Sequence, residues 1–282
     1  ILMALNASAQ SDLSSPYSRF GMGDVFTGSP NTILKGMGGI SNAISDHSIL
    51  NPNNPASYGA IDSLSFLFDA GFYIKTATFS TSNMSEKGSN TSFDYASIGL
   101  SATKWWKMGL GITPYSNREY NDITTHNDLG KYNIDFKGEG GLSRVFFANA
   151  FKITKNLSIG ATASYIFGTL SDLTSIYVPD STYYINGKRS IDNRINDFKF
   201  DYGLLYTIPI KDSKLNIGLT YSQGSNINSK RDIFIRSMFK GYDDLVENPI
   251  DTLKFKENEN VAIKIPHGFG AGITFEKGNR WM

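Results

Sequence analysis

The sequence contains no cysteine, which excludes a disulfide framework, a thiolate metal site and a cysteine nucleophile. Histidine is scarce, and His47, His126 and His267 lie too far apart for ligand spacing. Charged residues make up only 19% of the chain, and a net charge of +1 with interspersed signs forms no basic patch for nucleic acid. We therefore expect no metal, no cofactor and no nucleic-acid partner.

Long hydrophobic runs are also missing. No stretch reaches 18 apolar residues, so the sequence predicts no transmembrane helix. Residues 1–10, ILMALNASAQ, predict the remnant of a signal peptide with cleavage near Ala9 or Gln10, and an apolar N-terminal strand is the alternative. An initiator methionine and a basic leader are absent, so we expect a chain clipped at its start. An exported chain of this kind is periplasmic, secreted or an outer-membrane barrel.

Aromatic residues and glycine are plentiful, and apolar residues recur at every second position, as in a half-buried strand. Between residues 198 and 210, aromatic and aliphatic side chains alternate with Lys199, Asp201, Gly203 and Thr207. The same alternation recurs along the chain and predicts eight strands. They span 62–80, 91–103, 105–122, 132–154, 157–171, 194–210, 214–234 and 256–276.

The predicted connections alternate between short and long. The short ones lie around Lys104 and at 155–156, 211–214 and 277–280, and the long ones at 81–90, 123–131, 172–193 and 235–255. Short periplasmic turns that alternate with long external loops are typical of outer-membrane barrels. A soluble β-sandwich shows the same alternation with its apolar face inward. Strand length, loop parity and the signal peptide favour an all-β transmembrane antiparallel barrel over residues 62–282. The final residues, GNRWM, predict the start of a ninth strand, so we expect an incomplete barrel.

Residues 11–61 precede the first strand and are too apolar for disorder and too long for a tether. They would plug the lumen, pack on the periplasmic rim or bind a partner, and we favour a compact plug, or hatch. Apolar residues between Ile33 and Ile44 have roughly helical spacing. The glycines at 36, 38 and 39 would allow close packing, and Asn54-Pro55-Ala56 would mark the turn into the wall.

These residues resemble a known family. Gly-Met-Gly-Gly at 36–39, followed by Ala43, Asp46 and Asn54-Pro55-Ala56, resembles the FadL-type outer-membrane transporters for hydrophobic compounds. KIPHGFGAGITFE at 264–276 is similar to an Ile-Pro element of that family, and SPYSRFGMGD at 15–24 resembles its Bacteroidota-like branch. The resemblance implies fourteen strands, a lumenal hatch and lateral release through a strand kink. Pro114 is the candidate for that kink, and a bend near the rim is the alternative.

The resulting hypothesis is an outer-membrane channel for passive uptake of fatty acids or aromatic hydrocarbons. Its partners would be the outer-membrane bilayer, a hydrophobic small-molecule ligand and envelope proteins. The candidate ligand and hatch residues are Phe20, Met22, Ile33, Leu34, Met37, Ile40, Ile44, Ile49 and Leu50. The candidate hatch turn consists of Gly36, Gly38, Gly39, Asn54, Pro55 and Ala56. For each of them, plain packing of the plug against the wall is the alternative.

A second hypothesis is a barrel that does not transport and instead serves as a scaffold subunit of an envelope secretion or assembly complex. The long loops 172–193 and 235–255 and the segment 15–24 would then be docking surfaces. An enzyme is a third possibility, but no G-x-S-x-G elbow is present. We therefore expect a protein that is not an enzyme.

Overall fold

A computed structural model describes residues 16–29, 31–80, 85–127, 131–178, 185–240, 247–277 and 280–281. The predicted signal-peptide remnant at 1–10 lies outside the described residues. Within these ranges, no helix is both long enough and apolar enough to cross a membrane.

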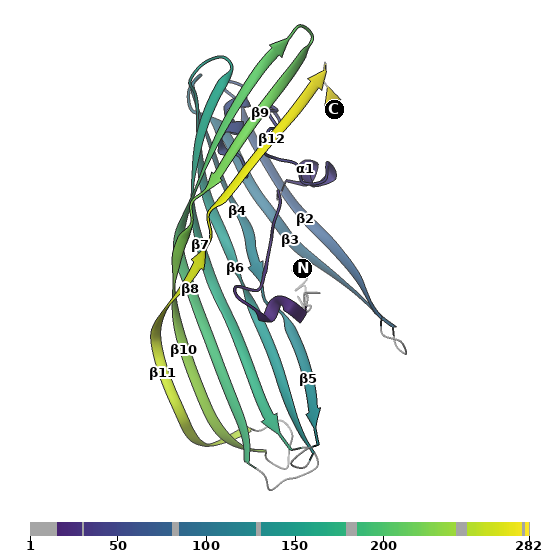
Figure 1. The fold of residues 1–282 in the computed structure, drawn as a ribbon, viewed down its shortest axis with the longest axis vertical. Coiled ribbons are helices and arrows are strands. Elements are labelled where there is room, and N and C mark those ends of the chain that lie inside the picture. Colours follow the sequence, from purple (N-terminus) through teal and green to yellow (C-terminus); the bar gives the residue numbers. More distant parts are fainter. Residues whose placement is uncertain are drawn as a thin grey trace, which may run out of the picture.

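The described strands form one curved antiparallel sheet (Figure 1). The helical elements are η1 (Pro16–Arg19), α1 (Thr32–Gly36) and η2 (Pro55–Ala60). The strands are β1 (Asp24–Val25), β2 (Phe66–Ser80), β3 (Ser85–Ser101), β4 (Trp106–Asn117), β5 (Tyr120–His126), β6 (Tyr132–Lys152), β7 (Leu157–Tyr177), β8 (Ile185–Ile210), β9 (Ser213–Ser222), β10 (Ser225–Lys240), β11 (Glu247–Ile265), β12 (Gly268–Lys277) and β13 (Arg280–Trp281).

Strands that follow one another along the chain are mostly neighbours in the sheet. The main path runs β2-β3-β4-β6-β7-β8-β9-β12-β13, with β5 paired to β6, β10 paired to β8 and β11 paired to β10. All of these pairings are antiparallel, as the sequence predicts. The described residues do not close the sheet, whose path runs from β2 at one edge to β13 at the other. The all-β antiparallel fold is confirmed, and the closed transmembrane barrel stays a prediction.

All eight predicted strands are present, but three of them are broken in two. The strand predicted at 105–122 becomes β4 and β5, that at 214–234 becomes β9 and β10, and that at 256–276 becomes β11 and β12. The prediction of long loops was wrong over much of its length, since β7, β8, β10 and β11 extend far into 172–193 and 235–255. Their sequences are rich in Ser, Asn and Lys, but pairing with neighbouring strands, with register shifts between β10 and β11, still holds them as strands.

The apolar and polar faces of the sheet differ in exposure. Large apolar side chains such as Phe269 and Ile273 are 83% and 73% exposed. Polar side chains at alternate positions, such as Ser164 and Asn216, are 0% and 1% exposed. The alternation that the sequence predicts is therefore present, with much of its apolar face exposed.

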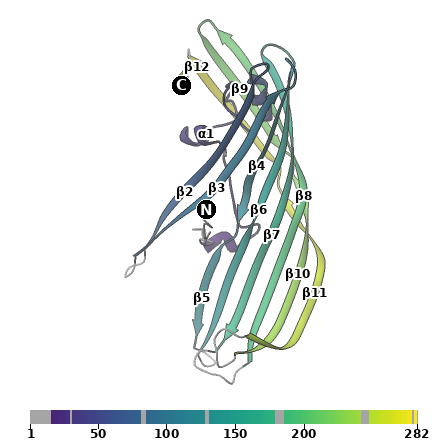
Figure 2. The ribbon, with the colours of Figure 1, turned by 180° about the vertical axis from the view of Figure 1, so that it is seen from behind.

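The segment 31–61 covers part of the concave face of the sheet, as both views show (Figures 1 and 2). Its Leu50, Tyr58 and Ile61 form an apolar cluster with Phe146 of β6. The wall carries glycines where this segment touches it. A β-carbon would collide with the segment at each of these wall glycines: Gly99, Gly109, Gly160, Gly203 and Gly218.

The prediction that the glycines at 36–39 allow close packing was wrong. A β-carbon at Gly36, Gly38 or Gly39 would meet no atom within 4 Å. Gly38 and Gly39 instead have φ angles of +78° and +80°, a left-handed backbone that glycine adopts without steric cost. This backbone ends α1 after five residues, so the predicted helical spacing up to Ile44 does not form a helix.

The β2–β3 hairpin and β4 are paired along only part of their length. Strand β3 pairs with β4 only from Ala96 to Ser101, and beyond this point the β2–β3 hairpin leans away from the other strands (Figures 1 and 2). The last two residues of β4 pair with β1 instead. A register shift separates Pro114 from Ser116, so the strand irregularity predicted at Pro114 is present.

Candidate functional site

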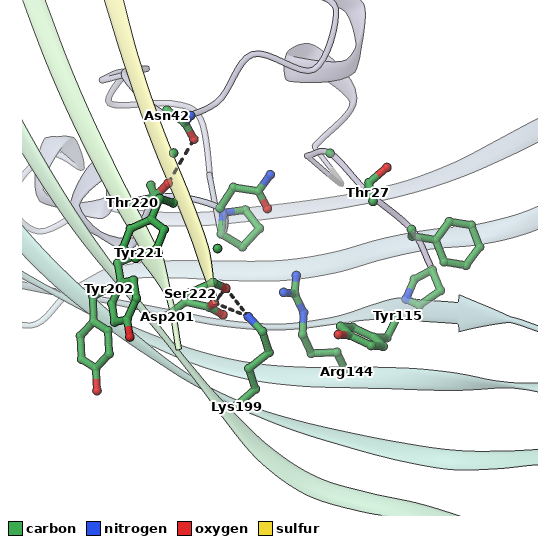
Figure 3. A pocket seen from close by; sticks show the side chains of 18 residues that line it. Thr27, Asn42, Tyr115, Arg144, Lys199, Asp201, Tyr202, Thr220, Tyr221 and Ser222 are labelled. Atoms are coloured by element: carbon green, nitrogen blue, oxygen red, sulfur yellow. Dashed lines mark hydrogen bonds and ion pairs between the residues drawn. The ribbon is translucent and has the colours of Figure 1, made fainter. Parts of the chain in front are cut away.

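A cavity of about 560 Å³ lies between the N-terminal segment, meaning the described residues between 16 and 61, and the concave face of the sheet (Figure 3). Strands β4, β6, β8, β9 and β12 form its wall, and residues 26–28, Asn42 and residues 52–53 of the N-terminal segment form the remainder. The lining residues are Phe26, Thr27, Gly28, Asn42, Pro52, Asn53, Pro114, Tyr115, Arg144, Lys199, Asp201, Tyr202, Thr220, Tyr221, Ser222, Gly268, Phe269 and Gly270. Its volume falls within the range of small-molecule sites, about 300–1,000 Å³.

Lys199, Asp201 and Ser222 form a polar network on one wall of the cavity (Figure 3). Lys199 and Asp201 are two positions apart on β8 and so point to the same face, and Ser222 of β9 lies opposite Asp201. The Lys199 ammonium forms an ion pair with Asp201 and donates to Ser222 Oγ at 2.6 Å. The Ser222 hydroxyl donates to the Asp201 carboxylate. Lys199 thus donates to two partners, the Ser222 hydroxyl donates to Asp201, and the charge of Lys199 is balanced by Asp201.

Arg144 of β6 reaches the cavity beside Tyr115 (Figure 3). Its side chain is half-buried, and its Nε is buried without a hydrogen-bond partner among the described residues. The described residues offer the guanidinium no ion pair, and its Cζ lies 5.7 Å from the centre of the Phe146 ring. Asp201, the carboxylate that lines the same cavity, is engaged by Lys199 and Ser222.

Asn42 joins the N-terminal segment to the wall at the other end of the cavity (Figure 3). Its Nδ2 donates to the Ala271 carbonyl at 3.2 Å, and the Thr220 hydroxyl donates to its Oδ1 at 3.5 Å. A β-carbon at Gly218 or Gly270 would collide with Asn42. The polypeptide backbones therefore approach closely here, and this contact fixes one boundary of the cavity.

A second polar cluster closes the break between β4 and β5. Arg118 is 3% exposed and its guanidinium lies 2.5 Å from the Asp172 carboxylate. It also donates to the Gly21 carbonyl of the N-terminal segment. Ser18 donates to the Glu119 carbonyl at 2.9 Å and accepts from the Glu119 amide at 3.2 Å. These hydrogen bonds hold residues 16–25 against the interruption between β4 and β5.

The candidate ligand residues predicted from sequence do not form a single group, and none of them lines this cavity. Leu34, Ile44 and Ile49 form a small core with Met37. Leu50 belongs to the cluster around Phe146, and Met22 packs against a third cluster around Leu142. Phe20, Ile33 and Ile40 are exposed.

The hatch-turn residues 54–56 are buried at the start of η2. The Asn54 side chain accepts from the Ala56 amide at 3.1 Å and donates to the Asn42 carbonyl at 2.5 Å. Pro55 lies directly against Gly160 of β7. These residues form a buried 3-10 turn ahead of β2, close to the turn into the wall that the sequence predicts.

Sequence reasoning missed Arg144, Lys199 and Asp201. The available signal was a charged residue within an alternating strand, on the face that carries glycine and serine. Lys199 and Asp201 fit this pattern, but only the register of β8 against β9 brings Ser222 to them. In the described part of the chain, no group of three His, Asp or Glu side chains is placed to hold a metal ion.

A family model described as BamG matches residues 1–282, the full sequence. No curated protein and no solved structure matches the chain. The assignment to the FadL-type transporters was wrong, because the short glycine and Asn-Pro motifs that carried it occur here in a chain that a different family model matches throughout. The chain belongs to the BamG family.

Proposed function

We propose that the protein is a scaffold subunit of an outer-membrane protein assembly complex, and that it carries no substrate across the membrane. Membership in BamG, a family related to the Bam complex, supports an assembly role in the envelope. The partners would be other envelope proteins of that complex. This is the second of the two hypotheses that the sequence raised.

The exposure pattern supports a sheet that lies in the outer membrane. Its exposed aliphatic and aromatic residues would contact lipid, as in transmembrane barrels, where the outward face is apolar. A crossing needs about 9–11 residues per strand. Strands β6 and β7 have 21 residues each and β8 has 26, so part of the sheet would extend beyond the bilayer. Such an extension would provide surface for partner proteins.

The close packing of residues 31–61 on the concave face is the observation that favours a scaffold over a transporter. Wall glycines on β3, β4, β7, β8 and β9 touch this segment so closely that even a methyl group would collide. The contacts include hydrogen bonds from Asn54 Nδ2 to Leu204 O at 3.4 Å and from Asn42 Nδ2 to Ala271 O at 3.2 Å. A ligand that passed along this part of the wall would have to displace a buried, hydrogen-bonded segment. Hydrophobic uptake has no support in this arrangement.

We also propose that the protein performs no covalent catalysis. Ser222 is the hydroxyl nearest to a lysine in the cavity, but Lys199 is ion-paired and the Ser222 hydroxyl donates to Asp201. A nucleophilic serine needs an adjacent group that can accept its proton, as a neutral lysine or histidine does. The carboxylate that accepts the Ser222 hydrogen is already ion-paired with Lys199, and no histidine is among the described residues that line the cavity, so we assign the network a structural role in the wall.

Depletion of the protein in its native host tests the assembly role. The amount of correctly folded outer-membrane barrel proteins should fall, measured as the heat-modifiable fraction on gels. Uptake of radiolabelled oleate, corrected for envelope integrity with a soluble dye, should stay unchanged. Normal barrel folding together with reduced oleate uptake would contradict the proposal.

A further inference from the structure

The charges around the cavity do not balance. Three charged residues line it: Arg144, Lys199 and Asp201. Lys199 and Asp201 form an ion pair, which leaves the guanidinium of Arg144 as one uncompensated positive charge. A charge that is partly removed from water is costly unless a counter-charge or hydrogen bonds compensate it. The cavity therefore offers an unmatched cation at its wall.

The geometry around Arg144 suits an oxyanion. A guanidinium presents its N–H groups in a planar fork that pairs with two oxygens at once. In the described part of the chain the Arg144 Nε is buried without a hydrogen-bond partner, and the side chain reaches the cavity that Tyr115 also lines, with no hydrogen bond drawn from its guanidinium to the other lining residues (Figure 3). Competing acceptors are few, because the nearby Asp201 carboxylate already accepts from Lys199 and Ser222.

The lining restricts the ligand further. Polar side chains are spread around the cavity, among them Thr27, Asn42, Asn53 and Thr220, and the aromatic rings of Phe26 and Tyr115 lie among them. This mixture suits a compact molecule that combines one charge with a small apolar body. A single uncompensated positive charge matches a monoanion better than a phosphate monoester, which carries about −1.5 to −2 at neutral pH.

We propose that this cavity binds a compact organic monocarboxylate, with Arg144 as the residue that anchors the carboxylate group. Lys199 and Asp201 position the site by ordering the wall beside Arg144, while Arg144 makes the direct contact. The site goes beyond the assembly role, and its failure would leave that role intact.

Calorimetric titration of the full chain in detergent micelles tests the site with benzoate as the probe. Benzoate should bind saturably, and benzamide, which has nearly the same shape without the charge, at least tenfold more weakly. Inorganic phosphate should bind more weakly than benzoate. Equal affinity for benzoate and benzamide, tighter binding of phosphate, or no saturable binding of benzoate would overturn the proposal. This comparison uses only the wild-type chain and does not depend on the folding of any variant.

Variants then locate the anchor. Arg144→Gln should weaken benzoate binding at least tenfold, and Arg144→Lys, which keeps the charge and loses the fork, should give an intermediate affinity. Arg231→Gln is the matched control, since Arg231 lies on β10 outside the cavity and its Nε donates to Asn193 at 2.9 Å. Its affinity for benzoate should equal that of the wild type. Unchanged binding in a folded Arg144→Gln protein would overturn the assignment of Arg144.

Discussion

Asn54 and Gly203 touch across the boundary between the N-terminal segment and β8, where a β-carbon on Gly203 would overlap the side-chain oxygen of Asn54. The same Asn54 side chain donates to Asn42 O and to Leu204 O, the residue after Gly203. A single glycine thus allows the segment to reach the wall and to bond with it. The same kind of contact accounts for the glycines at 99, 109, 160 and 218.

Replacement of Gly203 by valine should destabilise the protein by about 1–3 kcal/mol, the usual cost of overpacking a well-filled interior. Gly187 on the same strand is the matched control, because a β-carbon there meets no atom within 4 Å. Gly187→Val should change the free energy of unfolding by less than about 0.5 kcal/mol. Urea unfolding in detergent micelles, followed by tryptophan fluorescence, measures both. Equal losses in the two variants would mean that the segment does not pack on β8 in this way.

Tyr58 lies in the same contact and should respond to removal of its hydroxyl. The residue is 1% exposed, and its Oη has no hydrogen-bond partner among the described residues. A buried hydroxyl without a partner costs about 1–3 kcal/mol, so Tyr58→Phe should stabilise the fold by an amount in that range. Tyr206→Phe, at a 42% exposed position, should stay within about 0.5 kcal/mol of the wild type. A destabilised Tyr58→Phe protein would show that the hydroxyl has a partner after all.

The same residue gives a pH dependence. Burial raises the pKa of Tyr58, because the phenolate is poorly solvated in this interior. In the unfolded chain the group ionises near pH 10, while in the folded chain it stays neutral, so unfolding releases a proton above that pH. The free energy of unfolding of the wild type is therefore unaffected by this ionisation below about pH 10 and falls as the pH rises further. The advantage of Tyr58→Phe over the wild type should therefore grow between pH 9 and 11.

Arg118 should be critical for the N-terminal attachment. Arg118→Met removes one partner of the pair with Asp172, which also accepts from the Tyr120 hydroxyl at 2.7 Å. We expect a loss of about 2 kcal/mol, below the 3–5 kcal/mol of fully buried pairs because the Asp172 side chain is 25% exposed. The double variant Arg118→Met/Asp172→Asn should be more stable than Arg118→Met, since no unpaired carboxylate remains. Limited proteolysis near residues 16–25 and urea unfolding provide the readouts, and a double variant less stable than the single one would contradict this account.

The eight strands were predictable because alternation is a property of each strand alone. Phe198, Phe200 and Tyr202 mark one face of β8 whatever its neighbours are. The breaks were not predictable in the same way. The interruption after Asn117 exists because the Arg118 amide donates to the Gly140 carbonyl, and Ser18 satisfies the backbone of Glu119. Those partners are distant in sequence, so no local pattern announces them.

The cavity was harder to predict than the fold. Its cationic residues, Arg144 and Lys199, lie on strands whose alternation predicts the face of the sheet on which each side chain lies, but not whether that side chain lines a cavity. Lys199 finds Asp201 two positions along its own strand, whereas Ser222 joins them only because β8 aligns with β9. Exposure within the predicted hatch was equally hard to predict. Ile33 and Ile40 are apolar in sequence, yet both are exposed, Ile33 within α1 and Ile40 beyond its end at Gly36.

His267 lies at a point where two adjacent stretches of chain both leave the regular sheet pairing, between β9 and β10 and between β11 and β12. The pairs Ser222–Gly268 and Ser225–Ile265 flank it, so β9 passes into β10 where β11 passes into β12. The His267 Nδ1 accepts from the Gly224 amide at 3.1 Å. His267→Ala should leave that amide without its acceptor. Hydrogen exchange at Gly224, measured by NMR, should accelerate at least tenfold, the equivalent of about 1.4 kcal/mol of lost protection.

Two further variants separate the hydrogen bond from other effects of the ring. His267→Asn places a carbonyl oxygen near the position of Nδ1 and should restore most of the protection of Gly224. Tyr221→Phe removes a hydroxyl that lies 2.8 Å from Nδ1 but keeps the ring that stacks on His267 and the bond to Gly224. Exchange at Gly224 should then stay close to that of the wild type. If Tyr221→Phe accelerates exchange as much as His267→Ala does, the tyrosine hydroxyl and its orientation of the imidazole, rather than the acceptor alone, hold the break together.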